Sequence, residues 1–485
     1  MDTLNISWLT GLVMITLIGL FLMLFTTASK TLRTRRTSSS QTPPRSISPE
    51  KKSPQSSNPV DILPPQRRHA LATLLPNKPY KDIPEEEVRA HILPMTADFR
   101  QYTSQEGKGK EKQLFTPTGF SMSDLNALGN FPNYATLSGV PLPERYEGFD
   151  IERALPRPYR PFRWAYHQTM SLTKLEPNWW LELENTYKSR ITQRKSLYAI
   201  HGPGVLGALP GSELACKELM EMAIQFLCAR YPAYFSLINN KILVNKILGT
   251  ETDVYSKPPL EILMDNIPED FGIMLRDDES GNYFLRAGVI CSSMGWNVQS
   301  KVGLQLHRIH DDIPDYKEKM QFSMDRFFTK LPTDKPIQRG SWGLEIGQPL
   351  HMPPGDPHEK LRSVQDPNLK LEDCHLRVDW QTLRRLPLSG AVVFNFKALF
   401  TPVTEFKDEL CVPALLAKIM REGKENLMAY KGTWHVEHVV LPKLEEWARM
   451  QEEKGMVERG WEVATLDESP WFRGWEGKWR GQQGF

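Results

Sequence analysis

The sequence predicts an α+β fold preceded by one transmembrane helix, and three features support this prediction. Tyr283–Cys291 and Ala391–Phe396 are short runs of β-branched or aromatic residues between turn residues, which indicates buried strands. Amphipathic stretches surround these runs without a regular βαβ alternation, which favours α+β over a doubly wound sheet. A long apolar run at the N-terminus indicates the membrane helix.

The N-terminal segment is long enough to cross a bilayer. No charged residue lies between Thr3 and Ser29, and Ile6–Phe25 is almost continuously apolar. At about 1.5 Å of rise per residue, this run spans a hydrocarbon core of about 30 Å. A cleaved signal peptide is the alternative, but its apolar part is usually about 7 to 15 residues long and follows a basic start. We therefore expect residues 1–29 to be an anchor in the lipid bilayer.

Basic residues directly after this run predict the orientation of the chain. Lys30 and three arginines stand within residues 30–36. Because Lys and Arg next to a membrane helix normally stay in the cytoplasm, we expect a single-pass protein with a cytosolic globular domain. The endoplasmic reticulum or another intracellular membrane would be its location.

Composition divides the rest of the chain into four parts. Residues 30–70 are rich in Ser, Pro and basic residues, so we expect a disordered linker. Residues 71–169 contain much Pro, Gly and Tyr with little periodicity, which predicts an irregular wrap around the core. Residues 170–455 hold the main domain. Residues 456–485 form a tail rich in Trp and Arg, which contacts either a membrane interface or its own domain.

Four helices are expected in the main domain. Apolar residues at helical spacing over 180–191 predict the first, and Ser212 opens a second that stops before Pro232. A third covers about residues 315–331. A fourth starts near Pro442, because proline is well suited to the first turn of a helix.

Charge and motifs exclude several functional classes. The formal net charge of +2, without a basic stripe, argues against a nucleic-acid partner. The five cysteines form no CxxC pair, which fits free thiols in a reducing compartment better than disulfides or a zinc site. The sequence also lacks GxxxxGK[ST], GxSxG and HExxH.

Two classes of membrane-anchored enzyme are also disfavoured. A cytochrome P450 needs a Gly-bracketed cysteine loop late in the chain, and Cys374 and Cys411 lack those surroundings. The acidic pair Asp311-Asp312 is compatible with a glycosyltransferase, but such enzymes place their domain in the lumen, on the opposite side from the one expected here.

The segment Val302–Tyr316 places His307 and His310 beside an apolar pattern. A neutral imidazole on an apolar wall is a good axial ligand for haem iron. Considered alone, a histidine in this setting is more often a hydrogen-bonded structural residue. Both interpretations stay open at this point.

The segment Cys374–Phe396 places His375, Arg377, Gln381 and Arg384 close together. If the segment is extended, alternation puts His375, Arg377 and Asp379 on the same face. Cationic side chains at a core hold carboxylates such as haem propionates or an acidic substrate. A surface ion-pair network is the alternative.

The segment Cys374–Phe396 carries a family resemblance, together with the longer block Leu285–Tyr316, MDRFFTKL (Met324–Leu331) and MAYKG (Met428–Gly432). The chain resembles the haem-dependent oxidative N-demethylase alpha subunits, also called the HRQ or DUF3445-type family, from about residue 170 to residue 447. The usual HLRxERQTLxRLPxSGAxxF stands here as HLRVDWQTLRRLPLSGAVVF, with Asp379 for Glu and Trp380 for Arg. The arginine lost at position 380 would remove one cation from the site.

The resemblance implies a PAS-like core, enlarged by helices, that binds haem b and uses dioxygen and electrons to oxidise a C–N bond. His310 keeps its place in the usual IHxPVP motif, so it is preferred over His307 as the iron ligand. The other implied roles are these: His375, Arg377 and Gln381 as catalytic residues, and Arg377, Arg384, Trp296 and Lys301 as cofactor-binding residues. The chain has no cysteine cluster that could hold iron–sulfur centres, so a separate reductase must donate the electrons.

The resulting functional hypothesis is a membrane-anchored haem-dependent oxidoreductase of the monooxygenase or oxidative N-demethylase type. Its substrate would be a small amine or a molecule like a secondary metabolite. Two alternatives belong to other classes: a non-catalytic PAS-like module that senses haem or a small ligand, and an anchored scaffold without a cofactor.

Overall fold

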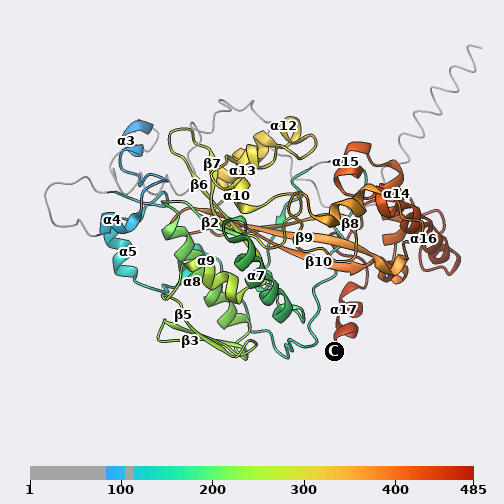
Figure 1. The fold of residues 1–485 in the computed structure, drawn as a ribbon, viewed down its shortest axis with the longest axis horizontal. Helices are drawn as coiled ribbons and strands as arrows, with labels where there is room; N and C mark the ends of the chain where they lie inside the picture. The colour runs from blue at the N-terminus through green and yellow to red at the C-terminus, as the bar shows by residue number, and fades with distance from the viewer. Residues whose placement is uncertain (1–83, 104–113, 168, 485) are drawn as a thin grey trace, which may run out of the picture. The chain divides into compact units, whose positions relative to one another are not determined.

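Residues 84–103, 114–167 and 169–484 are described by the computed structural model, and seven of their strands form one antiparallel sheet (Figure 1). The strands are β1 (Thr173–Lys174), β2 (Leu206–Ala208), β6 (Asp270–Arg276), β7 (Tyr283–Val289), β8 (Ile337–Ile346), β9 (Cys374–Arg385) and β10 (Val392–Pro402). Their order is β1-β8-β9-β10-β6-β7-β2. Helices and strands mix as the sequence predicts, and β7 and β10 confirm the two predicted strands.

Strands β9 and β10 set the two faces of this sheet, because successive side chains of a strand point to opposite sides. In the register, Gln381 pairs with Phe396, and Leu383 pairs with Phe394. These four side chains therefore share one face. A tight connection joins the two strands, and its Gly390 has a φ of +71°, which glycine adopts without strain.

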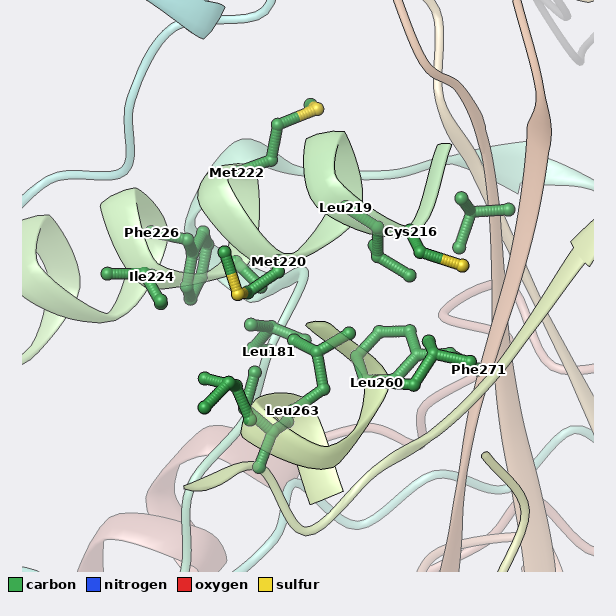
Figure 2. Packing of buried hydrophobic residues seen from close by; sticks show 14 of the residues in the cluster. Leu181, Cys216, Leu219, Met220, Met222, Ile224, Phe226, Leu260, Leu263 and Phe271 are labelled. Atoms are coloured by element: carbon green, nitrogen blue, oxygen red, sulfur yellow. The ribbon is translucent and has the colours of Figure 1, made fainter. Parts of the chain in front are cut away.

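Three helices cover the other face of the sheet: α7 (Tyr187–His201), α8 (Glu213–Arg230) and α9 (Pro259–Asn266). α8 begins directly after Ser212 and ends before Pro232, as predicted. Figure 2 shows Leu219 of α8 pointing toward Leu260 of α9 and Phe271 of β6. Each fully buried leucine of this kind stabilises the fold by roughly 1.5–3 kcal/mol.

The helix predicted over residues 180–191 is wrong in its first half, because α7 begins only at Tyr187. Trp180 and Leu183 precede it in an irregular stretch, and both are buried. Glu182, which lies between them, forms a buried ion pair with Arg157 at 3.0 Å. Because Arg157 lies outside residues 180–191, this ion pair holds the backbone at Glu182 in a non-helical conformation.

Four short helices lie on the face that carries Leu383 and Phe394: α10 (Val298–Lys301), α11 (Leu306–Ile309), α12 (Tyr316–Lys319) and α13 (Gln321–Lys330). α11, α12 and α13 pack through a small apolar cluster that includes Met274 and Leu285 of the sheet, and Val298 of α10 packs in a second small cluster with Ile290 and Phe396. The predicted helix at residues 315–331 exists but is interrupted at Met320, between α12 and α13.

The last helices pack with β8, β9 and the loops that follow β10. They are α14 (Val412–Glu422), α15 (Glu425–Tyr430), α16 (Trp434–Glu453) and α17 (Trp475–Gln483). The prediction that a helix starts near Pro442 is wrong, since this proline lies inside α16. Val436, Val440 and Leu444 are fully buried on both sides of it, so their packing outweighs the hydrogen bond that proline cannot make.

Smaller elements complete the described residues. They are α3 (Glu85–Arg89), α4 (Phe99–Thr103), α5 (Met122–Leu128), α6 (Tyr134–Ser138) and a second sheet of β3 (Phe235–Ile238), β4 (Ile242–Asn245) and β5 (Thr250–Asp253). The C-terminal tail packs against its own domain. The indole of Trp479 donates a 2.8 Å hydrogen bond to the carbonyl of Leu155.

The predicted transmembrane element and the single-pass localisation need correction. None of the described helices is long and apolar enough to cross a membrane. The longest, α16, has 20 residues, but it carries seven charged side chains. Residues 1–29, where the anchor was predicted, and residues 30–70, where the linker was predicted, lie outside the described residues. We carry the membrane assignment no further.

Candidate functional site

A cavity of about 490 Å³ lies between the sheet and helices α10 to α13. Its floor is apolar, because alternate residues of four strands point into it, among them Met274, Leu285, Leu383 and Phe394. Side chains of α13 and of the loop before β1 complete the wall. Ligand sites typically have volumes of about 300–1,000 Å³ and an apolar lining with a few polar groups.

His310 lines this cavity at the end of α11. Its Nδ1 lies 2.7 Å from the carbonyl oxygen of Leu306 and must donate to it, which leaves Nε2 as the unprotonated nitrogen of the neutral ring. The ring stacks on Tyr316, with centroids 4.9 Å apart. Burial lowers the pKa of His310 to about 4, and the nearby cations Arg339 and Lys301 act in the same direction. A neutral imidazole with a free Nε2 is the form that binds a metal.

Lys301 and Trp296 line the same cavity. The Lys301 ammonium donates to the carbonyl of Ile309 at 3.1 Å and lies 3.5 Å from Asp312, whose side chain is 88% exposed. Trp296 lies beside Phe396, with ring centroids 6.4 Å apart. The structure therefore brings three predicted cofactor residues, His310, Lys301 and Trp296, to one site.

Gln381 is the fourth predicted residue in the cavity wall. The register of β9 places it between Arg339 of β8 and Phe396 of β10, on the face that forms the floor. Gln381 therefore lies between the cationic side chain of Arg339 and the aromatic ring of Phe396.

Three cations that were not predicted from the sequence also line the cavity: Arg163 in the loop before β1, Arg339 of β8 and Lys431 after α15. Among the described residues, none forms a hydrogen bond or an ion pair with Arg339, and its buried Nε has no acceptor. The Lys431 amine lies 3.1 Å from the hydroxyl of Ser341. Burial, together with the nearby cation Arg339, lowers the pKa of Lys431 to about 7. Two features of the sequence could have revealed Arg339 and Lys431. Arg339 and Ser341 alternate along an extended segment, and Lys431 lies inside the MAYKG block.

His307 and His375 lie outside the cavity lining. His307 is half-buried on α11 and lies near Asp325 of α13. Burial raises the pKa of Asp325 to about 6, and His307 acts in the opposite direction. His375 meets the carbonyl of Asp373 at 3.1 Å through Nδ1 and the Gln348 amide at 3.3 Å through Nε2. Both nitrogens of His375 are therefore occupied by protein groups.

Arg377 is buried and holds backbone groups together. It donates to the carbonyl of Pro349 at 2.7 Å and to that of Ser292, and it pairs with Asp379 at 3.0 Å. β9 is extended here, so His375, Arg377 and Asp379 share a face, as the sequence predicted. The guanidinium supports the loops beside the cavity.

Arg384 lies on the opposite face of the sheet from the cavity. Its guanidinium stacks over Trp180 at 4.1 Å from the ring centroid, and burial lowers its pKa to about 10. The nearest acidic influence is Glu218 of α8. The geometry brings Arg384 to the α8 side and not to the cofactor residues.

Trp380, which stands where the family motif has an arginine, also faces away from the cavity. Trp380 stacks on Tyr159 with ring centroids 3.6 Å apart and belongs to the core under α14 and α16. An arginine at this position would not add a cation to the cavity. The expected loss of charge from the site is therefore not seen in the geometry.

This arrangement defines a class of protein: a mixed α and β domain that encloses one apolar, cation-lined cavity with a metal-competent imidazole. A comparison with protein-family models matches residues 171–441 to the haem-dependent oxidative N-demethylase alpha subunit-like family. The match spans more than half of the 485 residues, so the chain belongs to this family. The resemblance noted in the sequence is confirmed.

The residues of the cavity fit the haem that this family uses. Within the described part of the chain, no group of three or more His, Cys, Asp or Glu side chains could hold a bare metal ion. One imidazole suffices for an iron that a porphyrin already coordinates, and apolar walls suit the macrocycle. The cationic side chains of the lining, Lys301 and Arg163 among them, suit its propionates.

Proposed function

We propose that this chain is a haem-dependent oxidoreductase that binds haem b in the 490 Å³ cavity and removes an N-methyl group from a small amine. The observation that supports this most directly is the neutral His310, whose Nδ1 is fixed by Leu306 while Nε2 is left free. Family membership supports oxidative N-demethylase-like chemistry.

The chain's own residues would divide the work. His310 would be the axial ligand, and Lys301 and Arg163 are placed to pair with the propionates, since both line the cavity. When bound, haem supplies the dioxygen chemistry. Trp296 and the apolar floor would exclude water, and Gln381 would donate or accept a hydrogen bond near the substrate.

Arg377, His375 and Arg384 have different roles in this proposal. Arg377 is a positioning residue, because it ties the loops at Ser292 and Pro349 to β9. His375 extends the same support through Gln348. Arg384 belongs to the packing of α8 against the sheet.

The reaction needs a partner that supplies electrons. Removal of an N-methyl group as formaldehyde takes one oxygen atom into formaldehyde and one into water, and consumes two electrons and two protons. The GxGxxG run at residues 202–207 follows helix α7 and leads into strand β2, whereas a dinucleotide fingerprint follows a strand and opens a helix. The five cysteines are free thiols. We propose a separate reductase as the donor.

The test is an absorption spectrum of the purified full-length chain after addition of haem b. The wild-type chain is expected to give a Soret band that His310→Ala abolishes or shifts, because the ligand to iron is lost. His307→Ala, three residues away and half-buried, is the matched control and should leave the band unchanged.

Three outcomes separate the candidate functions. A wild-type chain that takes up no haem contradicts the proposal. A Soret band that survives His310→Ala contradicts the assigned ligand. A red protein that turns over no N-methyl amine with a generic reductase would be a haem-binding module without this activity.

A further inference from the structure

Four described cavity residues carry a positive charge, Arg163, Lys301, Arg339 and Lys431, and the lining holds a single carboxylate, Asp312. Asp312 is mostly exposed and lies beside Lys301. Two propionates would match two of the four cations. This leaves an excess of positive charge at the place where Arg339 and Lys431 meet.

Arg339 and Lys431 lie together because of the local backbone. Arg339 and Ser341 are two residues apart on β8, so they project from the same face of the strand. Ser341 is the hydrogen-bond partner of the Lys431 amine at 3.1 Å. The two cations are close enough that Arg339 lowers the pKa of Lys431.

Lys431 is held rigidly at this place. Its carbonyl accepts a hydrogen bond from the Leu344 amide at 3.2 Å, which joins the end of α15 to β8. A Cβ on Gly343 would lie 2.9 Å from the same carbonyl oxygen, so glycine permits the close approach. The amine also lies near the faces of Trp342 and Tyr430.

In the part of the chain that the structure describes, no carboxylate forms an ion pair with Arg339 or Lys431. Asp379 acts to raise the pKa of Lys431, but its carboxylate is paired with Arg377 at 3.0 Å. Among the described residues, Arg339 has no hydrogen bond and no ion pair at all. Two like charges in a buried place are unfavourable unless an anion joins them.

We propose that Arg339 and Lys431 form the binding site for a carboxylate group of the substrate, so that the substrate is an N-methylated amino acid and not a simple alkylamine. This inference rests on the proposed function for the N-methyl group, while the carboxylate site stands on its own geometry. A protonated alkylamine would add a further cation to a cavity that already has an excess of them. A carboxylate would instead join the two cations, with Ser341 and Gln381 at its sides.

The experiment compares N-methylglycine with its amide, N-methylglycinamide, which has the same shape without the carboxylate. Calorimetry measures the binding of each to the haem-free and to the haem-loaded full-length chain. We expect the carboxylate to bind at least tenfold more tightly than the amide. Arg339→Gln and Lys431→Gln should each remove this preference and leave amide binding and haem absorbance unchanged.

Conservative variants keep the test decisive if the glutamine variants fold poorly. Arg339→Lys and Lys431→Arg retain the charge, so both should keep most of the carboxylate preference. Equal binding of acid and amide to the wild-type chain overturns the proposal. If Arg339→Gln instead loses haem, the pair holds a propionate, and the proposal is likewise overturned.

The measurement separates this inference from the proposed function. If the wild-type chain takes up no haem but still prefers the carboxylate, the demethylase proposal fails and the carboxylate site stands. If haem binds and acid and amide bind equally, the carboxylate site fails alone.

Discussion

His310 and Lys431 owe their lowered pKa values to the same main cause, which is burial, and the cation Arg339 acts in the same direction on both. For each base, the charged form loses its hydration, and the carboxylates of Asp311 and Asp379 offset only part of this loss. The consequences differ with the chemistry. A neutral imidazole offers a lone pair to iron, whereas an amine with a pKa of about 7 changes its charge within the working range of pH.

The Lys431 amine is expected to titrate near pH 7 in the haem-free chain, compared with about 10.5 in an unfolded chain. Between these two pH values the unfolded state binds more protons, so this group makes the fold more stable as pH rises from 7 to 10.5. NMR of isotope-labelled lysine, assigned with Lys431→Gln, measures the midpoint.

Adding N-methylglycine gives a second readout of the same group. A bound carboxylate favours the ammonium form, so the midpoint should move upward and the affinity should rise as pH falls from 8 to 6. A midpoint near 10.5 in the free chain would show that the amine reaches solvent, contrary to this account.

At the scale of elements, the sequence predicted those that depend on local pattern. β7 and α8 were predictable because turn residues and a helix-opening Ser212 bound clear periodic runs. β8 was missed, although Arg339 comes from it, because its polar and glycine residues follow no simple alternation. The start of α16 was missed because Pro442 reads as a helix start, and only tertiary packing shows that it is internal.

The candidate site shows the same limit. His310, Lys301, Trp296 and Gln381 were identified from two sequence segments, and the fold brings them together. Arg384 was grouped with them because it is near in sequence. Strand alternation sends it to the opposite face, and only the register of a known sheet reveals which face holds the cavity.

α17 provides the element-scale prediction. Trp479 is 6% exposed and its indole is hydrogen-bonded to Leu155, so Trp479→Ala removes both packing and a hydrogen bond. We expect the free energy of unfolding to fall by about 3–5 kcal/mol. Urea denaturation of the full-length chain measures the change.

Trp434→Ala is the matched control, because Trp434 is 52% exposed. Its effect should stay within about 0.5 kcal/mol. Equal effects of the two substitutions would mean that the tail does not stabilise the domain through Trp479.

At the scale of the whole molecule, the two layers that cover the sheet differ in how they are held. α8 has 18 residues and packs into the large core with α9. α10, α11 and α12 have four residues each and pack through two small clusters beside the cavity. Helices this short are unstable alone, so the layer on the cavity side should open more readily than the layer of α8.

Haem binding should therefore be visible in amide hydrogen exchange. A ligand that His310 binds stabilises the closed layer by about 2.7 kcal/mol when its concentration is 100 times Kd, which slows local opening about 100-fold. We expect amides of residues 306–330 to exchange faster than those of α8 before haem is added and to slow after it, while the slowest amides of α8 change less. His310→Ala should remove the haem-dependent protection. A bound ligand mainly slows the local openings that would release it. Protection gained only around α8 would therefore place the cofactor on the opposite face of the sheet.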